Sequence, residues 1–282
     1  MNQDACILKD LRKQIFLMSY AAGTGHLASA YSSLEILFTL YTKGILNITP
    51  ETIDSPHRDK LILSKGHSSL ALYAVLAKTG FIPKDSLMTF AQPNSILGGE
   101  PNRLEIPGVE ATTGSLGHGL SLGVGIAYAD KLENRSCKTY VIIGDGESEE
   151  GSIWEAAMAA KKMNLSNLVV IVDQNRIQKM CEVKETIGFD HWQEKWSSFG
   201  FETVNVDGHD VDALISCFSA LNANDKTAPH VVLANTTKGH GVSIMENNPI
   251  WHWKQPNKKE LKKIVAELDI SQEELDYAKS LH

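Results

Sequence analysis

Two apolar runs, joined by a helical segment, constrain the fold of this chain more than any other feature. The first run, residues 140–143, ends in Gly-Asp-Gly at 144–146, and the second, residues 168–172, ends in Asp-Gln-Asn at 173–175. Between them, residues 153–163 carry apolar side chains at helical spacing. Short apolar strands that alternate with a helix are typical of a βαβ unit, so this stretch predicts two neighbouring parallel strands.

The polar residues that follow these two strands predict a metal-binding edge of the sheet. In open α/β sheets, ligands bind outside the carboxyl ends of the strands, where Asp145 and Asn175 should lie. Gly144 and Gly146 let the backbone approach a bulky anion closely. A carboxylate oxygen and an amide oxygen suit Mg²⁺, which completes its coordination with phosphate and water. Gly-Asp-Gly alone is equally typical of an ordinary capped turn, but the surrounding βαβ pattern favours a cofactor site.

The alternation of strands and helices continues along the chain and predicts an α/β fold. The 282 residues, 43% of them hydrophobic, can bury the core of one large domain, although this length would also permit two. We interpret residues 1–282 as one domain with a doubly wound, mainly parallel sheet, helices on both faces and a charged helical tail from Asn257. The other predicted helices cover residues 4–22, a segment from about Ser32, 70–78, 190–199 and 211–221, and the other predicted strands cover 60–63, 201–206 and 230–235.

Glycines and other small residues recur in a predicted helix from Gly117 to Leu132. Gly114, Gly117 and Gly119 superficially resemble a dinucleotide-binding loop, but their spacing is not G-x-G-x-x-G and no clear strand precedes them. We therefore expect the small residues to permit close packing against another helix or another subunit. Upstream, residues 81–111 contain several prolines and predict a short helix and a long loop of the kind that often lines a site.

Histidines that follow glycine in predicted turns indicate a polar site. His26 follows the first predicted helix, and His67 follows the strand at 60–63. Either one alone would more often be a structural histidine, but two such turns favour a site in which imidazoles handle protons near neutral pH. Residues 238–241, Lys-Gly-His-Gly, end a later strand on the same edge, and His252 follows in a loop.

Composition excludes several classes of function. The formal charge of −7 and a pI near 5.8 disfavour nucleic acid as a partner. The four cysteines lack C-x-x-C spacing, so we expect free thiols in a reducing compartment rather than disulfides or a zinc site. No apolar run reaches membrane-spanning length, and the N-terminus does not resemble a signal peptide. These features predict a soluble, cytoplasmic protein.

Together these motifs resemble the transketolase family, specifically its N-terminal, thiamine diphosphate-binding half, from the first helix to His252. Gly25-His26 and the segment 64–67, Ser-Lys-Gly-His, are similar to the family's two active-site histidine turns. The segment 113–117, Thr-Gly-Ser-Leu-Gly, is similar to the loop that meets the cofactor, and Gly-Asp-Gly with Asn175 is similar to the metal signature. The resemblance implies three sets of site residues: His26, His67 and His252 as catalytic; His67, Gly114, Ser115, Leu116, Gly144, Asp145, Gly146, Glu150 and Asn175 for the cofactor; and Asp145, Asn175 and the Ile177 carbonyl for a divalent cation such as Mg²⁺.

The chain also departs from this family in three ways. Transketolases continue with a pyrimidine-binding domain that carries the glutamate needed for cofactor activation, and this chain stops before it. We therefore expect the N-terminal component of a split enzyme, dependent on a C-terminal partner subunit, in an A₂B₂ assembly in which the chain also self-associates as a dimer. Glu100 stands where the family usually has a histidine that contacts the donor, and residues 176–180 lack the usual Asp-Gly after the metal loop.

The resemblance implies transfer of a two-carbon ketol unit from a ketose to an aldose, with both sugars expected as phosphates. Two other interpretations share parts of the pattern. The α subunit of a 2-oxo acid dehydrogenase has the same metal signature and also relies on a β subunit, but the two Gly-His turns favour transketolase. A non-catalytic cofactor-binding paralogue would explain Glu100, but the presence of His26, His67, Asp145 and Asn175 argues against it.

Overall fold

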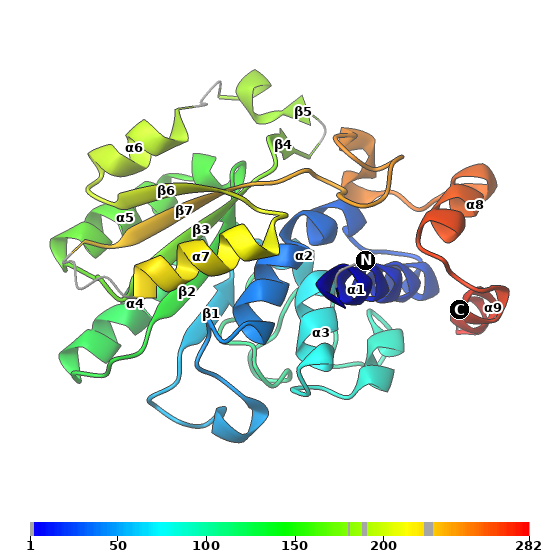
Figure 1. The fold of residues 1–282 in the computed structure, drawn as a ribbon, viewed down its shortest axis with the longest axis horizontal. Helices are drawn as coiled ribbons and strands as arrows, with labels where there is room; N and C mark the ends of the chain where they lie inside the picture. Colours follow the sequence, from blue (N-terminus) through cyan, green and yellow to red (C-terminus); the bar gives the residue numbers. More distant parts are fainter. Residues whose placement is uncertain (1–2, 180, 188–190, 223–227, 282) are drawn as a thin grey trace.

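The computed structural model describes residues 3–179, 181–187, 191–222 and 228–281, and a parallel sheet lies at its centre (Figure 1). In this part of the chain, five parallel strands run in the order β1-β2-β3-β7-β6. The strands are β1 Lys60–Leu63, β2 Thr139–Gly144, β3 Leu168–Gln174, β6 Glu202–Asp207 and β7 His230–Asn235, and a separate antiparallel pair comprises β4 Ile177–Gln178 and β5 Cys181–Glu182. The sheet confirms the predicted α/β class, including the βαβ unit around β2 and β3.

Helices cover both faces of the sheet, and the alternating side chains of its strands divide the core in two. Alternate residues of β3, such as Val169 and Ile171, pack under α1, α2, α3 and α7, whereas Val170 and Val172 pack under α4, α5 and α6. The described helices are α1 Gln3–Ala22, α2 Leu27–Thr42, α3 Ser69–Lys78, α4 His118–Leu132, α5 Gly151–Lys162, α6 Trp192–Ser198, α7 Val211–Asn222, α8 Lys258–Glu267 and α9 Gln272–Ser280. None of the helices in these ranges is both long and apolar enough to cross a membrane.

The second helix begins earlier than the sequence predicts. The sequence predicts its start near Ser32, but α2 begins at Leu27, directly after His26. Nearly all of α2 is buried, so it lacks the amphipathic period that would mark its first turn. The Ser33 hydroxyl donates to the Ser29 carbonyl at 3.1 Å, and the Ser32 hydroxyl donates to the Asp173 carboxylate at 2.6 Å, so both remain satisfied inside the buried helix. The helix expected from residue 190 is observed as α6, and residue 190 itself lies outside the described ranges.

The small residues of α4 pack against the sheet of the same chain. A Cβ on Gly123 would lie 2.4 Å from Cγ2 of Val141 on β2, and one on Gly119 would lie 2.3 Å from Oγ of Ser64. The expected packing against another helix or a subunit is therefore wrong for Gly119 and Gly123, whereas a Cβ on Gly117 would lie 2.5 Å from Oγ of Ser152 on α5, so that glycine does pack against another helix. Gly125, in contrast, meets no heavy atom within 4 Å of the position its Cβ would take, apart from its chain neighbours and the backbone of its own helix. The close approach places the N-terminus of α4 at the end of β1.

The C-terminal tail packs onto the first helix. In Figure 1, α9 lies beside α1, and α8 connects it to the rest of the molecule. Ile264, Leu268 and Ala278 of the tail are buried, and Lys13 of α1 donates to Glu274 at 2.8 Å. The tail is therefore a helical extension that packs against α1 as part of the folded structure.

Substituting the two glycines of α4 tests this packing. Gly123→Ala should destabilise the chain by roughly 1–3 kcal/mol, because the added methyl group has no room beside Val141. Gly125→Ala, the matched control on the same helix, should stabilise it by up to about 1 kcal/mol, since alanine favours a helix and the position is open. Urea unfolding of the isolated chain measures both; equal effects of the two substitutions would contradict the packing.

Candidate active site

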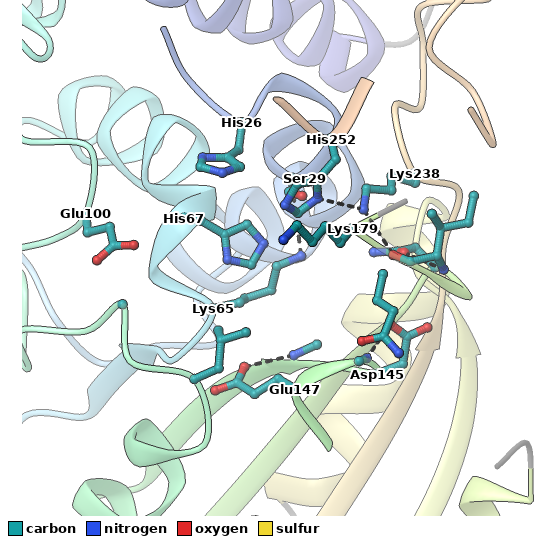
Figure 2. A pocket seen from close by; sticks show the side chains of 17 residues that line it. His26, Ser29, Lys65, His67, Glu100, Asp145, Glu147, Lys179, Lys238 and His252 are labelled. Carbon is teal, nitrogen blue, oxygen red and sulfur yellow. Dashed lines mark hydrogen bonds between the residues drawn. The ribbon is translucent and has the colours of Figure 1, made fainter. Parts of the chain in front are cut away.

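A cavity of about 320 Å³ opens at the carboxyl edge of the sheet, where β2, β3 and β7 end (Figure 2). The start of α2, the turn after β1, and the segments at Glu100 and at residues 114–116 complete its wall. Its lining residues are His26, Ser29, Lys65, His67, Glu100, Gly114, Leu116, Gly144, Asp145, Gly146, Glu147, Asn175, Ile177, Gln178, Lys179, Lys238 and His252. The cavity thus contains most of the residues that the sequence singles out, although these come from widely separated segments of the chain.

Three histidines meet at one end of the cavity. The ring centroid of His26 lies 5.2 Å from that of His67 and 5.1 Å from that of His252, and His67 and His252 are 5.7 Å apart. Burial and the Lys238 ammonium lower the pKa of His26, and burial and Lys65 hold the pKa of His67 well below its ordinary value. The pKa of His252 falls to about 3 for similar reasons. All three are therefore neutral imidazoles near pH 7, each with one nitrogen that donates a hydrogen bond and one that accepts.

Oxygen atoms from the predicted metal-binding residues line the other end. The Asp145 carboxylate accepts the backbone N–H groups of Gly146, at 2.9 Å, and Arg176. Burial and the nearby Asp173 raise the pKa of Asp145 to about 6, so its charge lacks full compensation. The Asn175 side-chain oxygen accepts the Ile177 N–H at 3.1 Å, which sets the orientation of that amide. A carboxylate, an amide oxygen and a backbone carbonyl are hard donors, so this set fits Mg²⁺ or a similar cation.

Two buried lysines, which the sequence patterns did not assign to the site, supply its positive charge. Lys65 forms an ion pair with Asp173, and both side chains are almost completely buried. The Lys238 ammonium donates to the Ile177 carbonyl at 3.0 Å and lies 3.1 Å from Nδ1 of His252. Burial and Lys65 lower the pKa of Lys238 to about 8. Both lysines immediately precede a Gly-His pair after a strand, and that repeated pattern could have identified them.

A buried glutamate, also absent from the predicted set, connects the loops on two sides of the cavity. Glu147 accepts the backbone N–H of Gly117 at 2.9 Å and that of Gly144 at 3.1 Å, and it also accepts the Ser64 hydroxyl. Burial raises the pKa of Glu147. Its carboxylate therefore holds the turn after β2 against the N-terminus of α4, and the segment 113–117 takes its place in the cavity wall through that link.

The remaining predicted residues divide into two groups. Gly114 and Leu116 line the cavity, whereas Ser115 and Glu150 are exposed and lie outside its lining. Glu100 does line the cavity, and Figure 2 shows it on the opposite side from Lys238 and Asp145. Its carboxylate lies so close to Gly114 that a Cβ at that position would overlap it. The φ of +139° at Gly114 gives a second reason for a glycine there.

The loop that carries Lys238 is anchored by a cluster of charged and aromatic side chains. Glu35 pairs with Arg12, and its other oxygen lies 3.0 Å from Nδ1 of His209. The Thr237 N–H donates to Nε2 of the same ring at 2.8 Å, and the ring stacks on His240 with 3.6 Å between centroids. Glu35, His209 and His240 are close enough to hold a metal ion. Because hydrogen bonds use both nitrogens of His209 and Arg12 compensates Glu35, the cluster is better explained as the anchor of this loop.

The amino-acid sequence matches known proteins of one family. Residues 18–275 match the family model described as transketolase, thiamine diphosphate binding domain. The chain is 38% identical to the A subunit of apulose-4-phosphate transketolase from Phocaeicola vulgatus, over 94% of this chain and 93% of that protein. It is 41% identical to the protein of the same name in Actinobacillus succinogenes, over 91% and 92% of the two chains.

Comparison of folds agrees with this result. The structure of transketolase from Leishmania mexicana superimposes with a TM-score of 0.85 at 24% sequence identity. That alignment covers 100% of this chain but only 44% of the Leishmania chain, so the chain spans less than half the length of this solved relative. At such identity the likeness establishes the fold alone: an α/β domain with a mainly parallel sheet.

The anchor cluster predicts how stability depends on pH. Burial alone would raise the pKa of Glu35, but the hydrogen bond from His209 and the charge of Arg12 lower it below its ordinary value. The stabilisation from this group is therefore complete above the unfolded-state pKa of about 4.3 and is lost as the pH falls through the lower folded-state value.

Glu35→Gln should reduce the free energy of unfolding at pH 7 by roughly 3–5 kcal/mol, because it leaves a buried Arg12 without its partner. The control is Asp4→Asn in the partly exposed pair with Lys43, which should cost at most about 1 kcal/mol. Urea unfolding at pH 7 and pH 3 measures both. A Glu35→Gln deficit that does not shrink at the lower pH would contradict the assignment.

Proposed function

The chain belongs to the transketolase family, within its thiamine diphosphate-binding domain, and from that membership we propose that it is the N-terminal subunit of a two-component transketolase. One observation carries the proposal: a single cavity gathers the three histidines with the oxygen ligands of Asp145, Asn175 and Ile177. The near-complete match to two relatives that are named as A subunits supports the two-component form. We propose residues 1–282 as one domain with a helical tail, acting in the cytoplasm on small molecules rather than on nucleic acid or membranes.

The cavity suits the diphosphate end of the cofactor. Asp145, Asn175 and the Ile177 carbonyl would hold the divalent cation, and Lys65 and Lys238 would offset the remaining negative charge of the diphosphate. When bound, thiamine diphosphate supplies a carbon nucleophile that also accepts the electron pair released by C–C cleavage. The backbone at Gly114 and Leu116 reaches the cavity wall, and it is proposed to contact the cofactor there.

The three histidines are the proposed proton-transfer groups. His26, His67 and His252 are neutral near pH 7 and lie within about 6 Å of one another. His26 and His67 can accept or return a proton at a sugar hydroxyl, and His252, whose Nδ1 faces Lys238, can orient a hydroxyl with its other nitrogen. The wall of imidazoles would orient the hydroxyl groups of a ketose donor, and removal of a hydroxyl proton is the step that these side chains can assist.

A partner subunit is the other half of this proposal. The two relatives that this chain matches over 93% and 92% of their length are both named as A subunits, which supports a separate second polypeptide. The exposed apolar side chains of Leu122 and Leu132 on α4 and of Met158 on α5, and the exposed Glu150, are proposed to contribute to self-association. An A₂B₂ assembly would close both cavities. The names of the two relatives, which specify apulose 4-phosphate, support a phosphorylated sugar as substrate, and they do not favour a 2-oxo acid dehydrogenase.

Substitution of the proposed metal ligands tests the cofactor site. Asp145→Ala should abolish Mg²⁺-dependent binding of thiamine diphosphate, because it removes the only charged ligand of the proposed set. Asn175→Ala should weaken binding less, since water can replace a neutral ligand. Calorimetry with the partner subunit present measures binding by both variants. Gln178→Ala is the control, because Gln178 lines the cavity but is not a proposed metal ligand. If both ligand variants bind like the parent, the metal assignment is wrong.

The isolated chain should be inactive. Its cavity holds the diphosphate end of the proposed site, and the thiazolium end would be exposed to water until a partner covers it. The chain is purified alone, supplied with Mg²⁺ and thiamine diphosphate, and assayed for ketol transfer, first alone and then with the partner subunit. Turnover should require the second polypeptide. Robust turnover by this chain by itself would rule out the two-component form.

Glu100 should influence the choice of donor. An ionised carboxylate only accepts hydrogen bonds, whereas the histidine usual at this position in the family can donate one. Glu100→His should therefore improve turnover of common ketose phosphates such as xylulose 5-phosphate in the assembled enzyme. Glu105→His, in the same loop but exposed and outside the cavity lining, is the matched control. Unchanged or lower kcat/KM for Glu100→His would exclude it as a determinant of the donor.

A further inference from the structure

Lys238 makes contacts that conflict with the proposed metal site. Its ammonium donates to the Ile177 carbonyl at 3.0 Å, the same carbonyl that is proposed as a ligand of the divalent cation. It also lies 3.1 Å from Nδ1 of His252, and Figure 2 shows these two side chains facing each other in the cavity. The side chain is 2% exposed. The ammonium therefore forms a hydrogen bond, from inside the cavity, with a carbonyl that is a proposed metal ligand.

The position of Lys238 is held firmly by its backbone. The Gly239 N–H donates to the Ala28 carbonyl at 2.9 Å, and the Lys238 carbonyl accepts the Asn247 N–H at 2.9 Å. Gly239 has a φ of +80°, and a Cβ there would lie 2.5 Å from the Met245 carbonyl oxygen. The cluster of Arg12, Glu35 and His209 anchors the same loop from its other side. The Cα position of Lys238 is thus fixed, and only the side chain beyond it can change conformation.

The charges around Lys238 explain why it points this way. The carboxylates of Asp145 and Asp173 attract its ammonium, and Lys65 opposes it. Lys65 already forms an ion pair with Asp173. A second cation therefore stabilises the buried carboxylate of Asp145 more than that of Asp173. A divalent cation at the same carbonyl would meet strong repulsion from the ammonium in this dry setting, unless an anion arrived to separate the two positive charges.

We propose that Lys238 occupies the cation position of the site before the cofactor binds and makes metal binding depend on the diphosphate. This inference rests on the proposed cofactor site and concerns how that site is loaded. With no cofactor, the ammonium holds the Ile177 carbonyl and excludes the metal. When diphosphate and metal enter together, the negative charge of the diphosphate compensates the ammonium, and the carbonyl is released to the metal.

The inference requires effects of opposite sign from one substitution. Lys238→Met nearly keeps the length of the side chain and removes its charge. It should bind Mn²⁺ alone at least tenfold more tightly than the parent, because no ammonium competes for the carbonyl. It should also bind thiamine diphosphate at saturating Mn²⁺ about tenfold more weakly, because the diphosphate loses a cation. Lys238→Arg, which keeps the charge, should stay within about threefold of the parent in Mn²⁺ binding.

Binding is measured on the full chain, by itself and in complex with its partner. Electron paramagnetic resonance follows free Mn²⁺, calorimetry follows thiamine diphosphate, and circular dichroism confirms that each variant is folded. Lys179→Met is the matched control, because Lys179 also lines the cavity but is exposed and makes neither contact of Lys238; both affinities should change less than about twofold.

Three results would overturn the inference. If Lys238→Met leaves Mn²⁺ binding unchanged or weakens it, while the parent binds Mn²⁺ and thiamine diphosphate together, Lys238 does not exclude the metal and the proposed function still stands. If Lys238→Arg behaves like Lys238→Met, the charge is not the operative property. If the parent binds neither Mn²⁺ nor thiamine diphosphate even with the partner subunit, the inference fails together with the proposed cofactor site.

Discussion

The site depends on one buried carboxylate. Asp173, at the end of β3, pairs with Lys65 from the turn after β1 and accepts the Ser32 hydroxyl of α2 at 2.6 Å and the Thr236 hydroxyl after β7. Four segments far apart in the chain therefore meet at one group. A buried charge is costly unless it is paired and fully hydrogen-bonded, and here both conditions are met. The same interaction aligns the strand ends from which the cavity is built.

The pairing of Asp173 with Lys65 determines which other charged groups of the cavity remain uncompensated. Lys65 is compensated by Asp173, whereas Asp145, deep in the same cavity, has two backbone N–H groups and a more distant cation to stabilise it among the residues that the structure describes. The cavity consequently holds buried groups of both signs that are incompletely matched. An anion together with a divalent cation would complete this balance, which is why a metal–diphosphate pair fits the residues better than either ion alone.

Much of this arrangement could be predicted from local pattern. Apolar runs bounded by glycine and polar residues located the strands, and the shared direction of parallel strands placed Asp145 and Asn175 at one edge of the sheet. His26 and His67 could be grouped because each follows glycine in a turn. Prediction was less successful at the start of α2, because a helix buried on all sides shows no amphipathic period at Leu27.

The sequence by itself determined the order of strands and helices, the fold class and the residues at the strand ends, because each of these follows from periodicity over a few neighbouring positions. Only the tertiary structure decided that Lys238 reaches the Ile177 carbonyl, that Glu147 links Gly117 to Gly144, and that Ser115 and Glu150 lie outside the cavity lining. These contacts join residues 3 to 61 positions apart, with Glu147 linked to Gly117 across 30. They depend on how the helices pack and which way each side chain turns, and local pattern carries no information about either.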